Sequence, residues 1–266
     1  MNDPYLYDDC AVLKNKLGIK DSALLDRAEV DISCNAIHDM SLSPVAGDYD
    51  FSHFCRCHAF IFGDIYEWAG EPRTVPMEKG EAVLGYMSVV YSLPEDIERV
   101  SSAVLARMKN IEWETLSLDG QAEELSNNLA ALWKAHPFRE GNTRTTITFV
   151  CQFAESRGML LDRALFEKNA IYTRNALVAA TAMFPDGDFR KPEYLLKIVR
   201  DALERGVMKS ETESIQRDAP PLPSRTLTGY KGLIDKERGK NGGNNRACGG
   251  GNKRRNTHND ADKQKE

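Results

Sequence analysis

Residues 136–144 constrain this chain more than any other stretch, reading His-Pro-Phe-Arg-Glu-Gly-Asn-Thr-Arg. Before them, apolar residues at 125, 129, 132 and 133 recur at helical spacing. Pro137 ends that helix near His136, because the residue before a proline is pushed out of the α region. After them an apolar segment runs to Gly158. We therefore predict a loop between two helices, with residues 141–143 leading into the second.

This loop combines the groups that phosphate chemistry uses. The free N–H groups and the dipole at a helix N-terminus bind anions, and Arg144 adds a fork of donors suited to phosphate. Glu140 is placed to bind a hard cation such as Mg²⁺, and His136 could take a proton from a hydroxyl near neutral pH. Each residue alone has a simpler interpretation, as a helix-end histidine or a solvated loop charge. Their combination at this spacing indicates a phosphate-transfer site.

The pattern His-Pro-Phe-x-Glu-Gly-Asn-x-Arg resembles the signature of the Fic family. A second block, Phe-Gly-Asp-Ile-Tyr-Glu-Trp-Ala-Gly at 62–70 followed by Arg73, resembles the family's upstream segment. The resemblance covers roughly residues 10–205. It implies a mainly α fold, a helical bundle with a small β-hairpin flap over the active site.

The resemblance also implies an activity, the transfer of AMP from ATP to a Ser, Thr or Tyr hydroxyl of a target protein with release of pyrophosphate. In that scheme His136 is the general base and Glu140 binds Mg²⁺. The phosphates are bound by Gly141, Asn142, Thr143 and Arg144. Phe138 is expected to anchor the loop in the core.

The flap is expected at about 73–90, with a hairpin turn near residues 78–81. In the family it docks the target peptide by strand addition, which uses backbone hydrogen bonds. The expected docking residues are Thr74, Val75, Pro76, Met77, Glu78, Lys79 and Gly80. An ordinary surface loop is the alternative interpretation.

Two positions depart from the family pattern. Thr143 replaces its usual third residue, a glycine, and Ile147 replaces a second arginine that contacts the γ-phosphate and pairs with an inhibitory glutamate. A degenerate Fic-fold interaction module, or a relative transferring another phosphate-containing group, therefore stays open as an alternative. No segment of the sequence matches the inhibitory helix motif of the family. A separate antitoxin-like inhibitor or another restraint is expected, and DNA gyrase is a family-level guess for the target of such a toxin-type enzyme.

Composition suggests three regions. Residues 1–49 form an N-terminal lead-in and helix, 50–208 the Fic domain core, and 209–266 a Pro/Gly-rich basic tail that we predict to be disordered. Helices are predicted at about 22–39, 52–67, 94–110, 121–135, 144–158, 165–184 and 191–208, with a turn at 185–188. Asp21 or Ser22 and Asp50 or Ser52 are the candidate caps of the first two. Residues 145–150 are β-branched and would favour a strand, but the anion-binding argument requires helix.

Charge and composition narrow the partners. The net charge is −5, divided into +6 over residues 219–266 and −11 over the rest, so nucleic acid is not expected as a ligand except through the basic tail. No run approaches eighteen apolar residues and the N-terminus lacks signal-peptide character, which together favour a cytoplasmic location without a membrane span. Cys55 and Cys57 beside His58 could suggest zinc, but no second pair sits at zinc-site spacing. We expect Cys57 and His58 to pack in the core.

Overall fold

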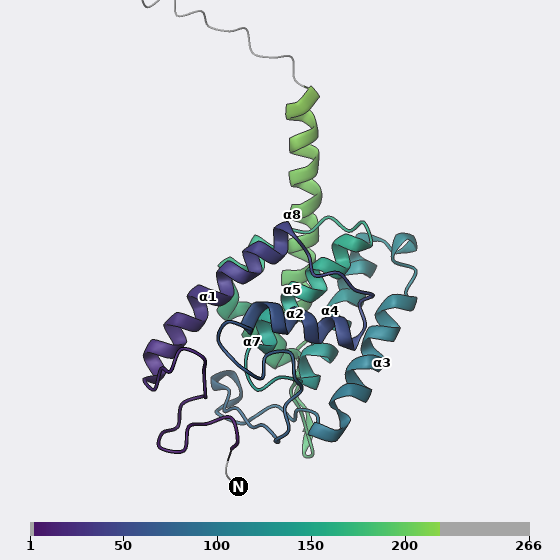
Figure 1. The fold of residues 1–266 in the computed structure, drawn as a ribbon. Helices are drawn as coiled ribbons and strands as arrows, with labels where there is room; N and C mark the ends of the chain where they lie inside the picture. Colours follow the sequence, from purple (N-terminus) through teal and green to yellow (C-terminus); the bar gives the residue numbers. More distant parts are fainter. Residues whose placement is uncertain (1–2, 219–266) are drawn as a thin grey trace, which may run out of the picture. The chain divides into compact units, whose positions relative to one another are not determined.

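The computed structural model describes residues 3–218, which form a mainly helical fold (Figure 1). The helices are α1 (Ser22–Leu42), α2 (Phe51–Phe62), α3 (Ile97–Asn110), α4 (Leu118–Ala135), α5 (Asn142–Ser156), α6 (Ala164–Lys168), α7 (Ala170–Thr181) and α8 (Glu193–Asp218). Three single 3₁₀ turns are η1 (Ala82–Leu84), η2 (Pro94–Asp96) and η3 (Trp113–Thr115). The predicted mainly α class is confirmed. The predicted tail lies almost entirely outside the described residues, although α8 extends ten residues past the predicted boundary at 208.

The first two helices begin where their capping residues predict. Asp21 accepts a hydrogen bond from the Leu24 N–H at 2.8 Å, and Asp50 accepts one from the His53 N–H at 2.7 Å. A carboxylate at this position satisfies one of the N–H groups that a helix leaves without a partner. These two caps fix the entry of α1 and α2 into the bundle.

The central helix is α5, which packs against α2 and α4. Ten of its fifteen residues are buried, so the helical interpretation of its β-branched segment is confirmed. The hydroxyl of Thr145 donates to the Gly141 carbonyl at 3.0 Å, and that of Thr146 donates to the Asn142 carbonyl at 2.7 Å. Because these hydroxyls are satisfied by the helix itself, threonine can be buried here without the cost of an unpaired polar group.

The small sheet lies elsewhere than predicted. Strand β1 (Met183–Phe184) pairs antiparallel with β2 (Gly187–Asp188), at the predicted turn, whereas residues 73–90 contain no strand. The predicted helix at 165–184 is divided at Asn169 (φ −120°) into α6 and α7 and stops before β1. The prediction of a flap hairpin was therefore wrong in its regular strands, although the presence of a small antiparallel sheet was right.

The flap segment folds instead as an irregular loop around η1. Its closing bonds run from the Glu81 N–H to the Met87 carbonyl at 3.1 Å and from the Lys79 N–H to the Ser88 hydroxyl at 2.9 Å. Tyr86 follows a glycine and has a positive φ of 69°. That conformation is costly for a bulky residue and is incompatible with strand geometry, which explains why no strand forms at this position.

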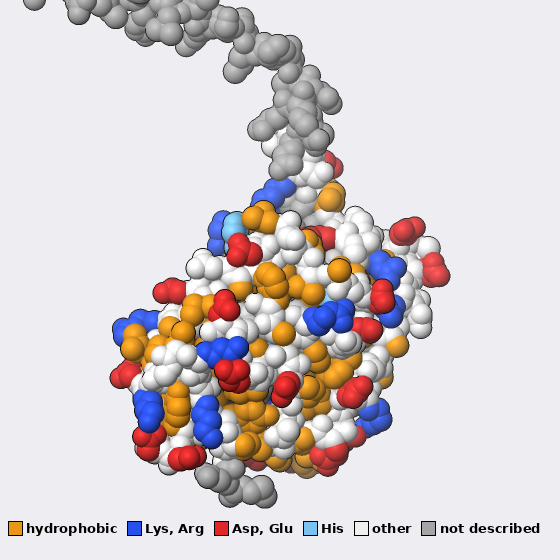
Figure 2. All heavy atoms as spheres, in the orientation of Figure 1, with side chains coloured by type: hydrophobic (Ala, Val, Ile, Leu, Met, Phe, Trp, Pro, Cys, Tyr) orange, Lys and Arg blue, Asp and Glu red, His pale blue; other side chains and the backbone are white. Residues whose placement is uncertain are grey.

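Among residues 3–218, no helix combines the length and the apolar composition that crossing a membrane requires. On the face drawn in Figure 2, acidic and basic side chains are interspersed with apolar ones. That face therefore presents no extended patch of a single charge.

Candidate active site

The loop at 136–141 is held by two residues with left-handed backbones. His136 (φ 48°) ends α4, and its N–H donates to the Trp133 carbonyl at 3.1 Å. Gly141 (φ 78°) is the N-cap residue directly before α5, and a Cβ at this position would lie 2.3 Å from the ring of Phe62. Only glycine meets both demands, since it tolerates positive φ and has no side chain. The predicted loop between two helices is confirmed.

The side-chain amide of Asn142 closes this loop on itself. Its oxygen accepts from the Phe138 N–H at 2.9 Å and its nitrogen donates to the Phe138 carbonyl at 2.7 Å. Phe138 is fully buried and stacks on His58 at 3.8 Å between ring centroids, so it anchors the loop as expected. His58 is a satisfied core histidine, because its ring bonds the Glu140 carbonyl and the Gly70 N–H. Asn142 thus shapes the loop, and its phosphate contact stays a prediction.

His136 carries a buried imidazole without a hydrogen-bond partner. It is 1% exposed, and neither ring nitrogen has a partner among the described residues. Tyr91 stacks on one face at 3.9 Å and Trp133 packs edge-on at 5.4 Å. Burial, followed by the positive charge of Lys79, holds the pKa of His136 well below its usual range. The ring is therefore neutral, which is the form that accepts a proton.

Glu140 presents an ionised carboxylate beside this ring. Its Oε1 accepts from the Gly141 N–H and its Oε2 from the Lys79 ammonium, each at 3.0 Å. Burial alone would raise the pKa of Glu140, but the charge of Lys79, the Gly141 N–H and then Arg144 outweigh it and lower the pKa to about 2. This carboxylate is charged throughout the neutral range.

The Glu140 carboxylate fits the role of protein ligand to a magnesium ion whose other ligands include phosphate oxygens. No group of three His, Cys, Asp or Glu residues able to enclose a metal occurs between residues 3 and 218. Mg²⁺, however, is usually held by one or two carboxylates together with substrate phosphates. The Lys79 ammonium already stands where a cation would meet Oε2. The single charged carboxylate of Glu140 therefore matches the protein contribution to such an ion.

The N-terminus of α5 offers free backbone donors next to Glu140. No side chain caps the helix, and Thr145 is the first residue whose N–H returns to a backbone carbonyl, that of Gly141 at 3.0 Å. Thr143 lies in α5 without a positive φ, and its hydroxyl accepts from the Trp133 indole N–H at 2.9 Å. An uncapped helix start of this kind attracts anions.

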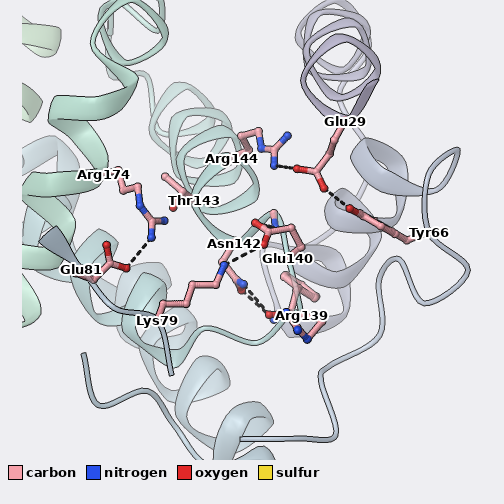
Figure 3. A network of polar contacts seen from close by, with 12 residues as sticks. Glu29, Tyr66, Lys79, Glu81, Arg139, Glu140, Asn142, Thr143, Arg144 and Arg174 are labelled. Carbon is pink, nitrogen blue, oxygen red and sulfur yellow. Dashed lines mark hydrogen bonds and ion pairs between the residues drawn. The ribbon is translucent and has the colours of Figure 1, made fainter. Parts of the chain in front are cut away.

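Arg144 is held by α1 on the other side of the loop (Figure 3). Its guanidinium donates to the Glu29 carboxylate and, at 2.7 Å, to the Ser33 hydroxyl, and it lies 4.8 Å over the ring of Phe62. The Tyr66 hydroxyl donates to the other oxygen of Glu29. Arg144 therefore lies at the expected place but is engaged by the protein itself.

Arg73 joins the root of the flap to the motif loop. It is buried, its Nε donates to the His136 carbonyl at 2.9 Å, and its terminal nitrogens donate to the carbonyls of Val75 and Ser92. Its own N–H donates to the Pro137 carbonyl at 2.7 Å. Both stems of the flap are thus fixed relative to the imidazole.

The seven expected docking residues lie together in the flap stem. Thr74, Pro76, Glu78 and Gly80 are exposed, and Val75, Met77 and Lys79 are half-buried. This alternation is typical of an extended segment with one face free. Target docking through it stays a prediction.

Sequence reasoning missed three contacts of the site. Nothing in the local pattern marked Tyr91 as the partner of His136 or Glu29 as the partner of Arg144. Arg73 was noticed only as part of the upstream block. A hollow lined by α4, α7, β2 and α8 lies elsewhere in the described residues and holds none of the motif residues. We place the site by its chemistry, at an uncapped helix start beside a charged carboxylate.

Comparison with known proteins decides the family. The model of the Fic/DOC family matches residues 48–154, which include the upstream block and the motif. "Probable protein adenylyltransferase y4lH" of Sinorhizobium fredii is 32% identical over 169 residues, covering 63% of this chain and 83% of that protein. The chain belongs to the Fic/DOC family. Protein adenylyltransferase VbhT of Bartonella schoenbuchensis is also 32% identical over 161 residues, 60% of this chain, but that stretch spans only 32% of VbhT.

Solved structures of Fic domains share the fold. The N-terminal Fic domain of a VirB-translocated Bep effector from Bartonella quintana superposes with a TM-score of 0.61 at 25% identity, covering 79% of this chain and 97% of that one. The BepC protein of Bartonella tribocorum, solved with bound AMPPNP, gives 0.60 at 21% identity over 74% of this chain and 95% of its own. The mainly helical Fic fold is thereby established for this chain.

Proposed function

We propose that this Fic-family chain transfers AMP from ATP to a hydroxyl of a target protein. The observation that supports this most is His136, a buried neutral imidazole whose two nitrogens lack protein partners. It is flanked by an ionised carboxylate and an uncapped helix start. Named relatives are protein adenylyltransferases, which points to AMP as the group transferred.

In the proposed reaction the target hydroxyl oxygen attacks the α-phosphorus, and the bond from that phosphorus to the bridging oxygen breaks. The hydroxyl proton passes to His136, and pyrophosphate leaves. The start of α5 binds phosphate oxygens through its free N–H groups. Glu140 would hold Mg²⁺, which neutralises phosphate charge when bound. Catalysis would rest on positioning and electrostatics.

A second candidate is a non-catalytic module that binds nucleotide. Arg144 is occupied by Glu29, and Ile147 places an apolar side chain on α5. Both features lower the number of cations free for phosphate. They make ATP binding without transfer the specific alternative that an experiment has to exclude.

Incubating the purified chain with Mg²⁺ and α-labelled ATP in a bacterial lysate separates these functions. Label on protein from the α position, lost in His136→Ala, supports AMP transfer. Label from γ-labelled ATP alone would indicate a kinase-like relative. ATP binding with no label from either position would overturn the proposal in favour of the binding module.

We further propose that the target and a small inhibitory partner are separate cytoplasmic proteins, as for enzymes of toxin type. Co-purification of the chain with a small co-encoded protein would support the inhibitor. Stable, non-toxic expression of the active chain alone would count against it. Gyrase subunits are candidates for the target only at the level of the family.

A further inference from the structure

The cations near the motif are already paired. Each of three arginines meets an acid outside the motif: Arg139 meets Asp3 at 2.7 Å, Arg144 meets Glu29, and Arg174 meets Glu81 at 2.6 Å. Lys79 differs, because its acid is Glu140 itself. The one carboxylate that is proposed to bind a metal is thus the one that a lysine occupies (Figure 3).

The Lys79–Glu140 pair is built to exchange partners. Oε1 of Glu140 is committed to the Gly141 N–H, which leaves Oε2 to the ammonium. The two side chains are 24% and 30% exposed, so water and ions can reach them. Lysine is a compact charge on a flexible stem, whereas an arginine would hold the carboxylate with a rigid fork.

The backbone that carries Lys79 is held in place by other contacts. Its N–H donates to the Ser88 hydroxyl at 2.9 Å. Two residues further on, Glu81 is buried and pairs with Arg174 on α7. Releasing the ammonium from Glu140 therefore leaves the flap loop in position, with the lysine stem next to the start of α5.

The helix itself has no second cation to offer. After Arg144, α5 contains no lysine or arginine through its last residue, Ser156. Any further positive group on a phosphate bound at this helix start has to come from another segment. Lys79 is a candidate, since its ammonium lies 3.0 Å from the Glu140 carboxylate. Glu140 precedes by two positions Asn142, the first of the free N–H groups at 142–144.

We propose that Lys79 and a divalent cation alternate on Glu140, and that the displaced ammonium then becomes a phosphate-binding group of the site. The two cations compete for Oε2, and they repel each other when both are near it. Metal binding thus converts Lys79 from a counter-ion of the protein into a ligand of the nucleotide. This inference rests on the proposed nucleotide function and assigns a role to a flap residue within it.

A double-mutant cycle tests the exchange by binding alone. ADP affinity is measured by calorimetry, with EDTA and with Mg²⁺, for the wild type, Lys79→Met, Glu140→Gln and the double variant. Without metal, Glu140→Gln should bind ADP about tenfold more tightly than the wild type, as one charged hydrogen bond allows, and the double variant should lose that gain. With Mg²⁺, Lys79→Met should bind ADP about tenfold more weakly than the wild type.

Metal binding without nucleotide gives an independent readout. Mn²⁺ titrated into Lys79→Met, followed by electron paramagnetic resonance, should bind more tightly than to the wild type, because its competitor is gone. Lys197→Met makes the same change in an exposed pair with Asp201 on α8 and should alter neither measurement.

Equal ADP affinity of Lys79→Met and the wild type in both conditions, or no difference between Glu140→Gln and the double variant, would overturn the exchange. Unchanged Mn²⁺ affinity in Lys79→Met would do the same. These results can be told apart from a failure of AMP transfer, because a protein that binds nucleotide without transferring AMP can still show all the affinity differences of the double-mutant cycle. Absence of ADP binding in every variant would remove the proposed function and the exchange together.

Discussion

Tyr91 lies nearly flat on His136, with ring centroids 3.9 Å apart and planes inclined by 24°. Tyr91 follows the flap and His136 belongs to the motif, so this contact joins the two segments at the proposed base. The Tyr91 hydroxyl is buried and has no partner among the described residues. The aromatic ring, and not the hydroxyl, is therefore what holds the imidazole in place.

Exchanging Tyr91 for Phe and for Ala separates ring from hydroxyl. Tyr91→Phe should preserve stability and AMP transfer, because removing an unpaired buried hydroxyl costs little. Tyr91→Ala should lower the free energy of unfolding by about 3–5 kcal/mol and weaken transfer, because His136 loses the aromatic ring that stacks on it. Urea unfolding and α-label transfer measure both. Loss of transfer in Tyr91→Phe would show that the hydroxyl takes part.

Acid should destabilise the fold through its buried histidines. Burial lowers the pKa of His58 to about 3, whereas an unfolded histidine titrates near 6.5. Between these values the unfolded chain binds a proton that the folded chain excludes. Stability therefore falls as the pH falls, by about 1.4 kcal/mol per pH unit for each such histidine.

Urea unfolding at several values between pH 4 and pH 7 checks this slope. The dependence of stability on pH should be shallower in His58→Gln below about pH 6.5, because glutamine keeps a donor and an acceptor but does not titrate. His38 is exposed on α1, so His38→Gln is the matched control and should leave the slope unchanged. Equal slopes in His58→Gln and the wild type would mean that this ring is protonated in the folded chain.

Adding one methyl group at Gly141 should disrupt the loop. The new Cβ would lie 2.3 Å from the Phe62 ring at a residue with φ 78°, so steric and backbone costs add. We expect Gly141→Ala to lose about 2–4 kcal/mol of unfolding free energy. Gly18 has φ 68° but nothing within 4 Å of its Cβ position, so Gly18→Ala reports the backbone cost alone. Equal losses at the two positions would show that Phe62 yields easily.

Removing the Asn142 amide should destabilise the motif loop, which this side chain holds closed. Asn142→Ala leaves the buried N–H and carbonyl of Phe138 without their partner, at a cost of about 2–4 kcal/mol. ADP binding should weaken as well, because the start of α5 loses its fixed geometry. Asn127 is exposed on α4, and Asn127→Ala should change neither quantity. Full stability of Asn142→Ala would mean that water replaces the amide.

Neutralising Glu29 should loosen α1 from α5. The Glu29 carboxylate accepts hydrogen bonds from both Arg144 and Tyr66, and the residue as a whole is 8% exposed. Glu29→Gln should lower the free energy of unfolding by about 1.5–3 kcal/mol, the range for hydrogen bonds to a charged group. Glu204 pairs with Arg200 on the exposed side of α8, and Glu204→Gln should cost about 0–1 kcal/mol. A similar small cost at Glu29 would show that Arg144 finds another acceptor.

Local chemistry was enough to predict the helices around the site. The caps at Asp21 and Asp50, the stop at Pro137 and the glycine after α5 act within one helical turn, so they are readable from sequence. The helical state of residues 145–150 was also predictable, although β propensity opposed it. It required the argument that an anion site needs a helix start.

Contacts between distant segments were not predictable in this way. Glu29 and Arg144 are 115 positions apart, and no periodicity links them. The flap strands were inferred from loose alternation, but the backbone of Tyr86 turns the chain out of register there. Such features depend on how packed elements meet, which a single sequence does not encode locally.

The guanidinium of Arg73 divides its donors between the carbonyl of His136 and two carbonyls at opposite stems of the flap, those of Val75 and Ser92. These segments therefore form one structural unit, whose parts have to be exchanged together. A chimera with a Fic relative that crosses over between residues 73 and 136 would join one parent's arginine to the other parent's backbone. We expect functional recombinants to place their breakpoints outside that interval.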